Sequence, residues 1–147
     1  GIYNRYVLSA AHNRHFLPVT GHEFGHSFGG LADEYFYDDQ YSNFYSSDVE
    51  PWEQNITTLA DFGSKWKDML PRGTKIPTST KGLSELDMRH IGVYEGGGYM
   101  SKGVFRPFVN CRMRTNEVSE FCGVCQRALR SIIEFYNRPQ DVPSPGR

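Results

Sequence analysis

Two histidines and a glutamate have the residue types and spacing of a metal-dependent hydrolase site. His22, Glu23 and His26 form the pattern H-E-x-x-H. Residues four apart on a helix lie about 40° apart around its axis, so both imidazoles would face one point and could hold Zn²⁺. Glu23 lies off that face, which predicts a general base acting on a zinc-bound water rather than a ligand. The pattern therefore predicts one catalytic zinc and a hydrolytic reaction.

A catalytic zinc needs a third protein ligand, and two acidic residues follow the second histidine. Gly29 and Gly30 would end the helix and turn the chain. Asp33 follows Gly30 by three residues, the offset at which metzincin peptidases place the third ligand after their glycine. We therefore predict Asp33 as the third ligand and keep Glu34 as the alternative. Both could also be ordinary loop carboxylates.

The elements around the motif can be predicted from residue pattern. A helix that begins at Pro18 or Thr20 and ends at Gly29–Gly30 would carry the motif. Its face opposite the histidines would pack on a sheet through Phe24, Phe28 and Leu31. Residues 3–9 are β-prone and predict an edge strand, which could align an extended substrate by main-chain hydrogen bonds.

The middle of the chain predicts mainly loop. Residues 32–52 are expected to form a long ordered loop packed by its own aromatic side chains. A short helix is expected within 59–70 and a brief strand over 91–94, followed by a mobile glycine-rich segment over 95–98. Pro107 argues against a central strand in its neighbourhood.

Apolar side chains at helical spacing predict a last helix over about residues 120–136. Residues 138–147 contain three prolines and are expected to form a tail or a linker. Residues 1–137 would then form one catalytic domain. Because the sequence opens directly on an expected strand, we expect further N-terminal strands, and flanking domains, to lie outside it.

Composition narrows the classes of partner. The chain has 147 residues, with 16 Lys and Arg against 17 Asp and Glu, and a net charge of -1. This balance gives no electrostatic reason to expect nucleic acid or an anionic membrane as partner. No apolar run is long enough to span a bilayer, so membrane insertion is not expected.

Longer stretches of the sequence extend the motif. Residues 22–35 read HEFGHSFGGLADEY, and distinctive stretches follow in order at 50–57, 73–78, 94–99, 103–107, 110–114 and 121–125. Together they resemble the IgA-peptidase family of zinc metallopeptidases. The resemblance implies a secreted zinc endopeptidase that hydrolyses protein or peptide substrates. Its fold would be α+β and metzincin-like, and this chain would hold mainly the active-site helix and the C-terminal part.

The residues also leave open a catalytically inactive binding or adhesion module that retains a structural zinc site. The two alternatives differ at Glu23, because a structural site has no use for a general base and a hydrolase requires one. The presence of Glu23 favours the enzyme.

The resemblance suggests a role for Met113. Metzincins place a methionine in a tight turn beneath the zinc, and Met113 resembles that residue, although a core methionine without special role is the alternative. Many such enzymes have a tyrosine two residues later, where this chain has Thr115. Any helper tyrosine would therefore come from elsewhere, such as Tyr35 or Tyr99.

Three cysteines, Cys111, Cys122 and Cys125, lie close together in the sequence. In a secreted protein the simpler prediction is one disulfide from Cys111 to either of the others, with one free thiol. The alternative is a second, structural Zn²⁺, since C-x-M followed by C-x-x-C resembles part of the second metal site of archaemetzincins. That site needs a fourth ligand, for which His90 is the candidate.

Overall fold

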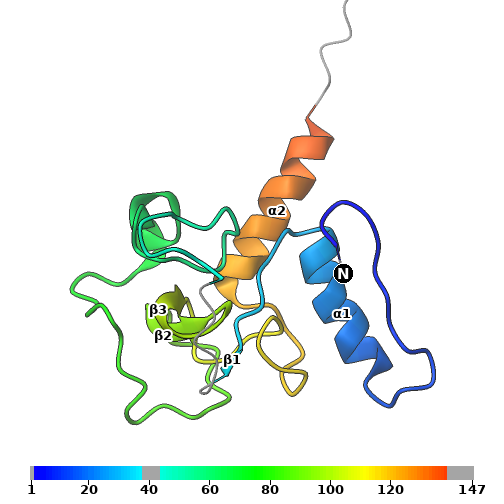
Figure 1. Ribbon diagram of the computed structural model, residues 1–147, viewed down its shortest axis with the longest axis horizontal. Coiled ribbons are helices and arrows are strands. Elements are labelled where there is room, and N and C mark those ends of the chain that lie inside the picture. The colour runs from blue at the N-terminus through cyan, green and yellow to red at the C-terminus, as the bar shows by residue number, and fades with distance from the viewer. Residues whose placement is uncertain (1, 38–43, 139–147) are drawn as a thin grey trace, which may run out of the picture.

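A computed structural model of the chain describes residues 2–37 and 44–138. Within these ranges the order of elements is α1 (Phe16–Ser27), β1 (Phe36–Tyr37), η1 (Phe62–Ser64), η2 (Lys67–Met69), β2 (Tyr94–Gly97), β3 (Tyr99–Arg106) and α2 (Gly123–Asn137) (Figure 1). The described residues therefore form a small α+β structure, with a long loop over residues 70–93 between η2 and β2. The predicted tail over 138–147 lies almost entirely outside the described residues.

The sheet has the order β1-β3-β2, and its pairings hold the loop that follows α1. β1 runs parallel to β3, with Phe36 opposite Tyr99, and β2 runs antiparallel, with Tyr94 opposite Arg106. A single residue, Gly98 at φ +55°, separates β2 from β3 and permits the tight reversal. The sheet thus brings the start of β3 beside residues 33–37.

Two predictions for this region are wrong. The glycine-rich segment over 95–98, expected to be mobile, forms most of β2 and its turn, because β3 supplies hydrogen-bond partners for it. β3 is the central strand despite its neighbour Pro107. It ends at Arg106, so the proline terminates the strand instead of interrupting its ladder.

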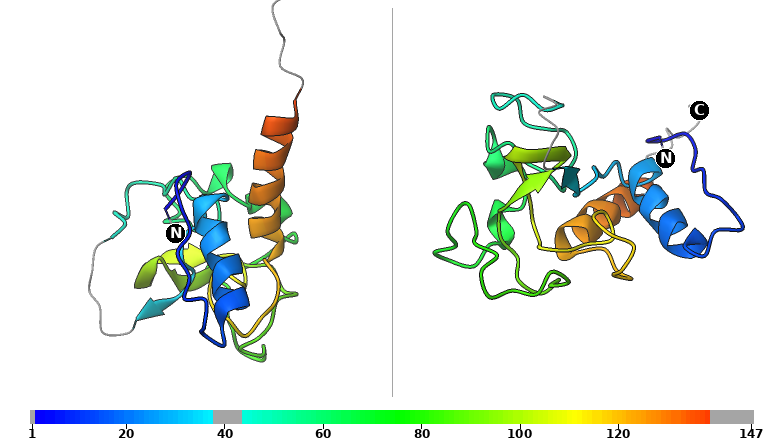
Figure 2. Two further views of the ribbon diagram at one scale, coloured as in Figure 1. Left: turned by 90° about the vertical axis from the view of Figure 1, so that its right-hand side faces the viewer. Right: turned by 60° about the horizontal axis from the view of Figure 1, so that its bottom comes forward.

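The predicted edge strand over 3–9 is also wrong. Ile2 and Tyr6 form only an isolated bridge around a turn, and the Asn4 amide donates to the Ser27 carbonyl at 2.7 Å. The segment runs along the outer side of α1, away from the sheet (Figures 1 and 2). No neighbouring strand among the described residues pairs with it, so it cannot align a substrate there as an edge of this sheet.

The motif helix forms, but it packs differently from the prediction. α1 begins at Phe16, so Pro18 lies in the first turn. Backbone amides there have no hydrogen-bond partner within the helix, so the lack of an amide hydrogen in proline costs no hydrogen bond. Phe24 is 46% exposed and stacks on Phe28 at 4.9 Å instead of packing on the sheet. The helix contacts the core on another face, through Gly25.

The later helical predictions have mixed outcomes. The predicted closing helix is confirmed as α2, which buries Val124, Cys125 and Ala128 near its N-terminus. Its C-terminal half extends beyond the rest of the molecule (Figures 1 and 2). Residues 59–70 contain two short 3₁₀ turns instead of one helix, and they place Trp66 in the core. No helix in the described part of the chain is both long and apolar enough to cross a bilayer.

Gly25 gives a test of the packing beneath α1. A Cβ there would collide with Met113 Sδ and lie 3.0 Å from Phe121 Cε1. We expect Gly25→Ala to lower the free energy of unfolding by about 1–3 kcal/mol. Gly21→Ala is the matched control, because its nearest neighbour is 4.0 Å away, and it should leave stability equal or slightly higher. Urea unfolding measures both, and equal stabilities would contradict the tight contact.

Candidate metal centre

The two motif histidines and Asp33 converge on one point. His22 and His26 lie one turn apart on α1, with their Nε2 atoms 3.0 Å from each other. Asp33 Oδ1 lies 2.8 Å from His22 Nε2 and 3.2 Å from His26 Nε2. Three potential ligand atoms therefore face one another, from a helix and from the loop that follows it.

The opposite nitrogen of each imidazole contacts a backbone carbonyl. His22 Nδ1 lies 2.9 Å from the Arg112 carbonyl, and His26 Nδ1 lies 2.6 Å from the Leu31 carbonyl. A carbonyl only accepts hydrogen bonds, so each Nδ1 carries the proton and each Nε2 presents its lone pair to the cluster. Metal-binding histidines in proteins are commonly oriented in this way.

The spacing of the three atoms fits a zinc ion. Ligands 2.0–2.2 Å from a tetrahedral zinc lie about 3.4 Å from each other. The observed separations between the two Nε2 atoms and Asp33 Oδ1 are 2.8, 3.0 and 3.2 Å, slightly tighter than this. Two lone pairs and a carboxylate oxygen that face one another are stabilised by a positive charge between them, which a zinc ion would supply. His22, His26 and Asp33 therefore fit a zinc with three protein ligands.

Tyr99 supports Asp33 from the sheet. Its hydroxyl donates a short hydrogen bond to Asp33 Oδ2, and burial together with that carboxylate raises the pKa of Tyr99 to about 12. Burial by itself would raise the pKa of Asp33. Contacts with the His22 and His26 imidazoles and the hydrogen bond from Tyr99 outweigh burial and hold the pKa of Asp33 well below its usual value. The carboxylate is therefore ionised and ready to bind a cation.

The loop between α1 and Asp33 is fixed by the backbone and by one buried amide. Gly30 adopts φ +57°, a conformation that favours glycine, and so turns the chain after the helix. The Asn55 side chain accepts from the Ala32 amide and donates to the Ala32 carbonyl, both at 2.8 Å. The Gly98 amide donates to the Asp33 carbonyl at 2.8 Å. These contacts position Asp33 before any metal binds.

Sequence reasoning did not identify Asn55 as a residue of the site. Its partner Ala32 is 23 residues away in the sequence, and no local pattern links the two. Thr57 and Phe105 exchange backbone hydrogen bonds at 3.0 and 2.8 Å, and this pairing with β3 carries Asn55 to the loop. Only the tertiary structure shows this role.

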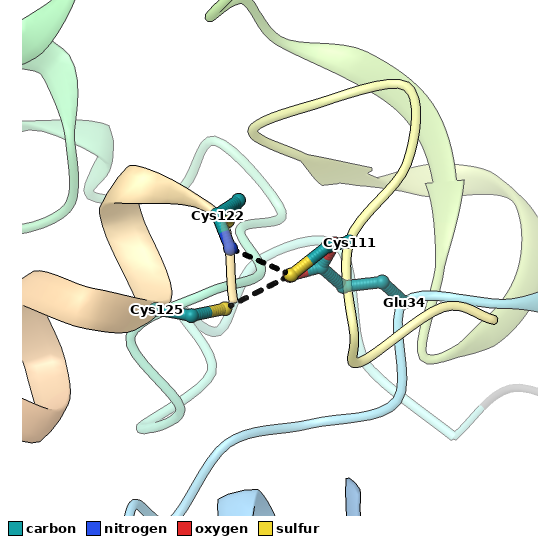
Figure 3. Close-up of side chains that lie close together, drawn as sticks. All are labelled: Glu34, Cys111, Cys122 and Cys125. Carbon is teal, nitrogen blue, oxygen red and sulfur yellow. Dashed lines mark hydrogen bonds between the residues drawn. The ribbon is translucent and has the colours of Figure 1, made fainter. Parts of the chain in front are cut away.

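Glu34 points away from the histidines, into a second cluster. Consecutive residues of an extended chain project to opposite sides, so Asp33 and Glu34 reach different sites. Glu34 is fully buried and lies with Cys111, Cys122 and Cys125 (Figure 3). Burial, and after it the charge on Cys111, raises the pKa of Glu34 well above its usual value. The structure thus brings Asp33, not Glu34, to the imidazoles.

Neither sequence prediction for the cysteines, a disulfide or a metal site completed by His90, agrees fully with the structure. All three are free thiols, and Cys111 Sγ lies 3.7 Å from Cys125 Sγ, whereas a disulfide requires about 2.05 Å. The predicted disulfide is therefore absent from the structure. His90 is not in the cluster, because its Nδ1 pairs with Asp87 Oδ2 at 2.9 Å. Glu34 occupies the fourth position that was assigned to His90.

Met113 lies beneath the histidines, as the resemblance implied. It is fully buried, and its Sδ is the atom nearest to a Cβ built on Gly25, between the two motif histidines. The Met113 carbonyl accepts from the Glu34 amide at 2.8 Å. The turn at Met113 therefore contacts both α1 and the loop that carries Asp33.

A surface hollow of about 300 Å³ lies over the cluster. It is lined by His22, Glu23, His26, Asp33, Tyr35 and Tyr99. Glu23 is half-buried there and is not one of the three convergent ligands. Both tyrosines considered as helpers line the hollow, whereas Thr115 lines a neighbouring one.

The fold and the site together have the features of a metallopeptidase centre: an H-E-x-x-H helix, a third carboxylate and a glutamate on the same hollow. A family model agrees with this class. The model described as IgA Peptidase M64 matches residues 1–89 and 83–133. The chain therefore belongs to the IgA peptidase family, whose members are metallopeptidases. Comparison with curated proteins gives no match.

Proposed function

We propose that this chain is the catalytic part of a secreted zinc endopeptidase of metzincin-like type. The observation that carries the proposal is the meeting of His22 Nε2, His26 Nε2 and Asp33 Oδ1, with Glu23 on the same hollow. Family membership supports peptide bonds of proteins as the substrate class. Residues 1–137 would form this catalytic domain, with residues 138–147 as a tail or linker to flanking domains.

His22, His26 and Asp33 would hold the ion, and the remaining residues of the hollow would handle substrate and protons. Zinc bound there supplies a Lewis acid that polarises the scissile carbonyl and makes water more acidic. Glu23 would take the proton from the attacking water and deliver it to the leaving amine. The position of Glu23 supports this role, because it follows His22 on α1 and lines the same hollow.

We give the two tyrosines that line the hollow different roles: one supports Asp33, and the other would contact the substrate. Tyr99 donates to Asp33, so its hydroxyl is engaged in holding that carboxylate. Tyr35 lines the hollow from the segment just before β1, and its pKa is raised well above the usual value by burial and by Asp33. A hydroxyl that stays protonated can donate to the oxyanion that forms on the substrate carbonyl. We assign this donor role to Tyr35.

Removal and return of zinc tests the proposal. Treatment of the chain with 1,10-phenanthroline should lower hydrolysis of an unfolded protein substrate at least about a hundredfold, because the Lewis acid is lost. Added Zn²⁺ should restore activity, and circular dichroism at each step separates loss of the catalytic ion from loss of the fold. Hydrolysis that continues in the metal-free chain would contradict the proposal. A zinc-loaded chain that cleaves no peptide would instead favour the binding module.

A further inference from the structure

The second cluster joins three segments that are distant in the sequence. Glu34 lies in the loop after α1, Cys111 precedes the turn at Met113, and Cys122 and Cys125 belong to the start of α2 (Figure 3). All four residues are buried, and their ligand atoms lie within 4.8 Å of one another. We infer that they form a structural zinc site, separate from the histidine cluster, with Glu34 as its fourth ligand.

The distances fit tetrahedral zinc. Two thiolates each 2.3 Å from a tetrahedral zinc lie about 3.8 Å apart, and a thiolate and a carboxylate oxygen lie about 3.6 Å apart. Cys111 Sγ and Cys125 Sγ are 3.7 Å apart, and Cys125 Sγ lies 3.3 Å from Glu34 Oε1. The Cys122 amide also points at Cys111 Sγ from 3.1 Å, a contact typical of a metal-binding thiolate.

The surroundings of Glu34 independently favour a cation beside its carboxylate. Its Oε1 accepts from Asn55 Nδ2 at 3.0 Å, but its Oε2 is buried and has no hydrogen-bond partner among the described residues. Arg106 and Arg114 act on it electrostatically, but neither they nor any other lysine or arginine in the described ranges forms an ion pair with it within 4.0 Å. A buried carboxylate without such partners is costly, and a zinc ion bound to it would remove that cost.

The composition and burial of the site favour a structural metal over a catalytic one. Three sulfurs suit a borderline-soft ion such as Zn²⁺ better than Mg²⁺ or Ca²⁺, which prefer oxygen. Four protein ligands leave no open position for water or substrate. Each ligand is at most 2% exposed, so the site is not accessible to a substrate.

This site would hold the parts of the catalytic centre in place. Asp33 and Glu34 are consecutive, so an ion bound to Glu34 also fixes the residue that meets the imidazoles. On the other side, Cys111 precedes Arg112, whose carbonyl orients His22. The structural zinc would thus tie both supports of the histidine cluster to the start of α2.

Zinc analysis of the wild-type chain and of His26→Ala tests the site without altering it. Wild type should contain about two zinc ions per chain and His26→Ala about one. X-ray absorption of the His26→Ala protein should show sulfur neighbours at about 2.3 Å. Zinc without sulfur neighbours in the wild type would overturn the inference. A wild type with only sulfur-bound zinc would keep it and contradict the proposed catalytic zinc instead, so the two failures are distinguishable.

Thiol counting separates the zinc site from a disulfide. Protein purified without reductant, then denatured in chelator, should react with Ellman's reagent at three thiols per chain. One thiol per chain would show that two cysteines are bridged and would overturn the inference.

Glu34→Gln tests the fourth ligand specifically. In a competition titration of zinc against a chromophoric chelator, we expect Glu34→Gln to weaken the sulfur site by at least tenfold. Glu120→Gln is the control, because Glu120 is exposed and lies two residues before Cys122. Unchanged affinity in Glu34→Gln would remove Glu34 from the site. If that variant does not fold, the absorption spectrum of the His26→Ala protein decides, since its single zinc should have one oxygen neighbour beside three sulfurs, and four sulfur or nitrogen neighbours without oxygen would remove Glu34 from the site.

Discussion

Glu23→Gln should keep the fold and the zinc content but lower peptide hydrolysis by about 10²–10⁴-fold or more. The substitution preserves the size of the side chain and removes the group that accepts the proton from water. Glu23 is not one of the three residues whose ligand atoms converge, so zinc binding should be unaffected. Hydrolysis of a quenched fluorescent peptide, with zinc measured on the same preparation, checks both parts.

Glu134→Gln is the control for this experiment, because Glu134 is exposed on the distant half of α2. It should have wild-type activity. Retained activity in Glu23→Gln, once contaminating peptidases are excluded by a second purification, would contradict the proposed proton transfer. Loss of zinc in Glu23→Gln would mean that Glu23 is a ligand, and the proposed division between ligands and base would be wrong.

Asp33→Ala should weaken zinc binding at the histidine cluster by more than about a hundredfold and abolish hydrolysis with it. Loss of an outer partner of a metal ligand typically costs 10–100-fold in metal affinity, and loss of a ligand itself costs more. Asp33 is 5% exposed and meets both imidazoles through Oδ1, so its removal takes away the only charged ligand of the cluster. Zinc affinity measured by competition with a chromophoric chelator gives the result.

Two further variants provide the comparison for the zinc affinity of Asp33→Ala. Asp61→Ala changes an exposed aspartate and should bind zinc as wild type does. Tyr99→Phe removes only the hydroxyl that donates to Asp33 Oδ2, so it should give an intermediate loss of about 10–100-fold. Unchanged zinc affinity in Asp33→Ala would place the third ligand elsewhere, while the peptidase proposal would remain to be judged by Glu23→Gln.

The features that the sequence predicted correctly are local ones. The i, i+4 spacing of His22 and His26 is sufficient to bring two imidazoles together, because helix geometry acts within one turn. The closing helix was predicted within three residues of its start because its apolar repeat lies within one element. The proximity of Asp33 to the imidazoles follows from its offset after Gly30, since a glycine in the left-handed region turns the chain over a few residues. Its role as a metal ligand stays a prediction.

The strand predictions failed where pairing with a segment distant in the sequence decides whether a strand forms. Residues 3–9 have the composition of a strand, yet an extended segment without a neighbour leaves its backbone groups unpaired, and it folds into a turn. Residues 95–98 have the composition of a loop, yet β3 pairs with them. Glycine content and β-propensity do not contain the information about which strand lies alongside.

By itself, the sequence determined the motif helix, the convergence of its two histidines and the family to which the chain belongs. The tertiary structure alone decided that Asn55 and Tyr99 support Asp33, and that Glu34 joins the cysteines in place of His90. The physical reason is the separation along the sequence of the residues in contact. Spacing along a helix or a short turn fixes neighbours within a few residues, whereas these contacts span 23 to 91 residues. They arise only when β3, the loop after α1 and the start of α2 pack together.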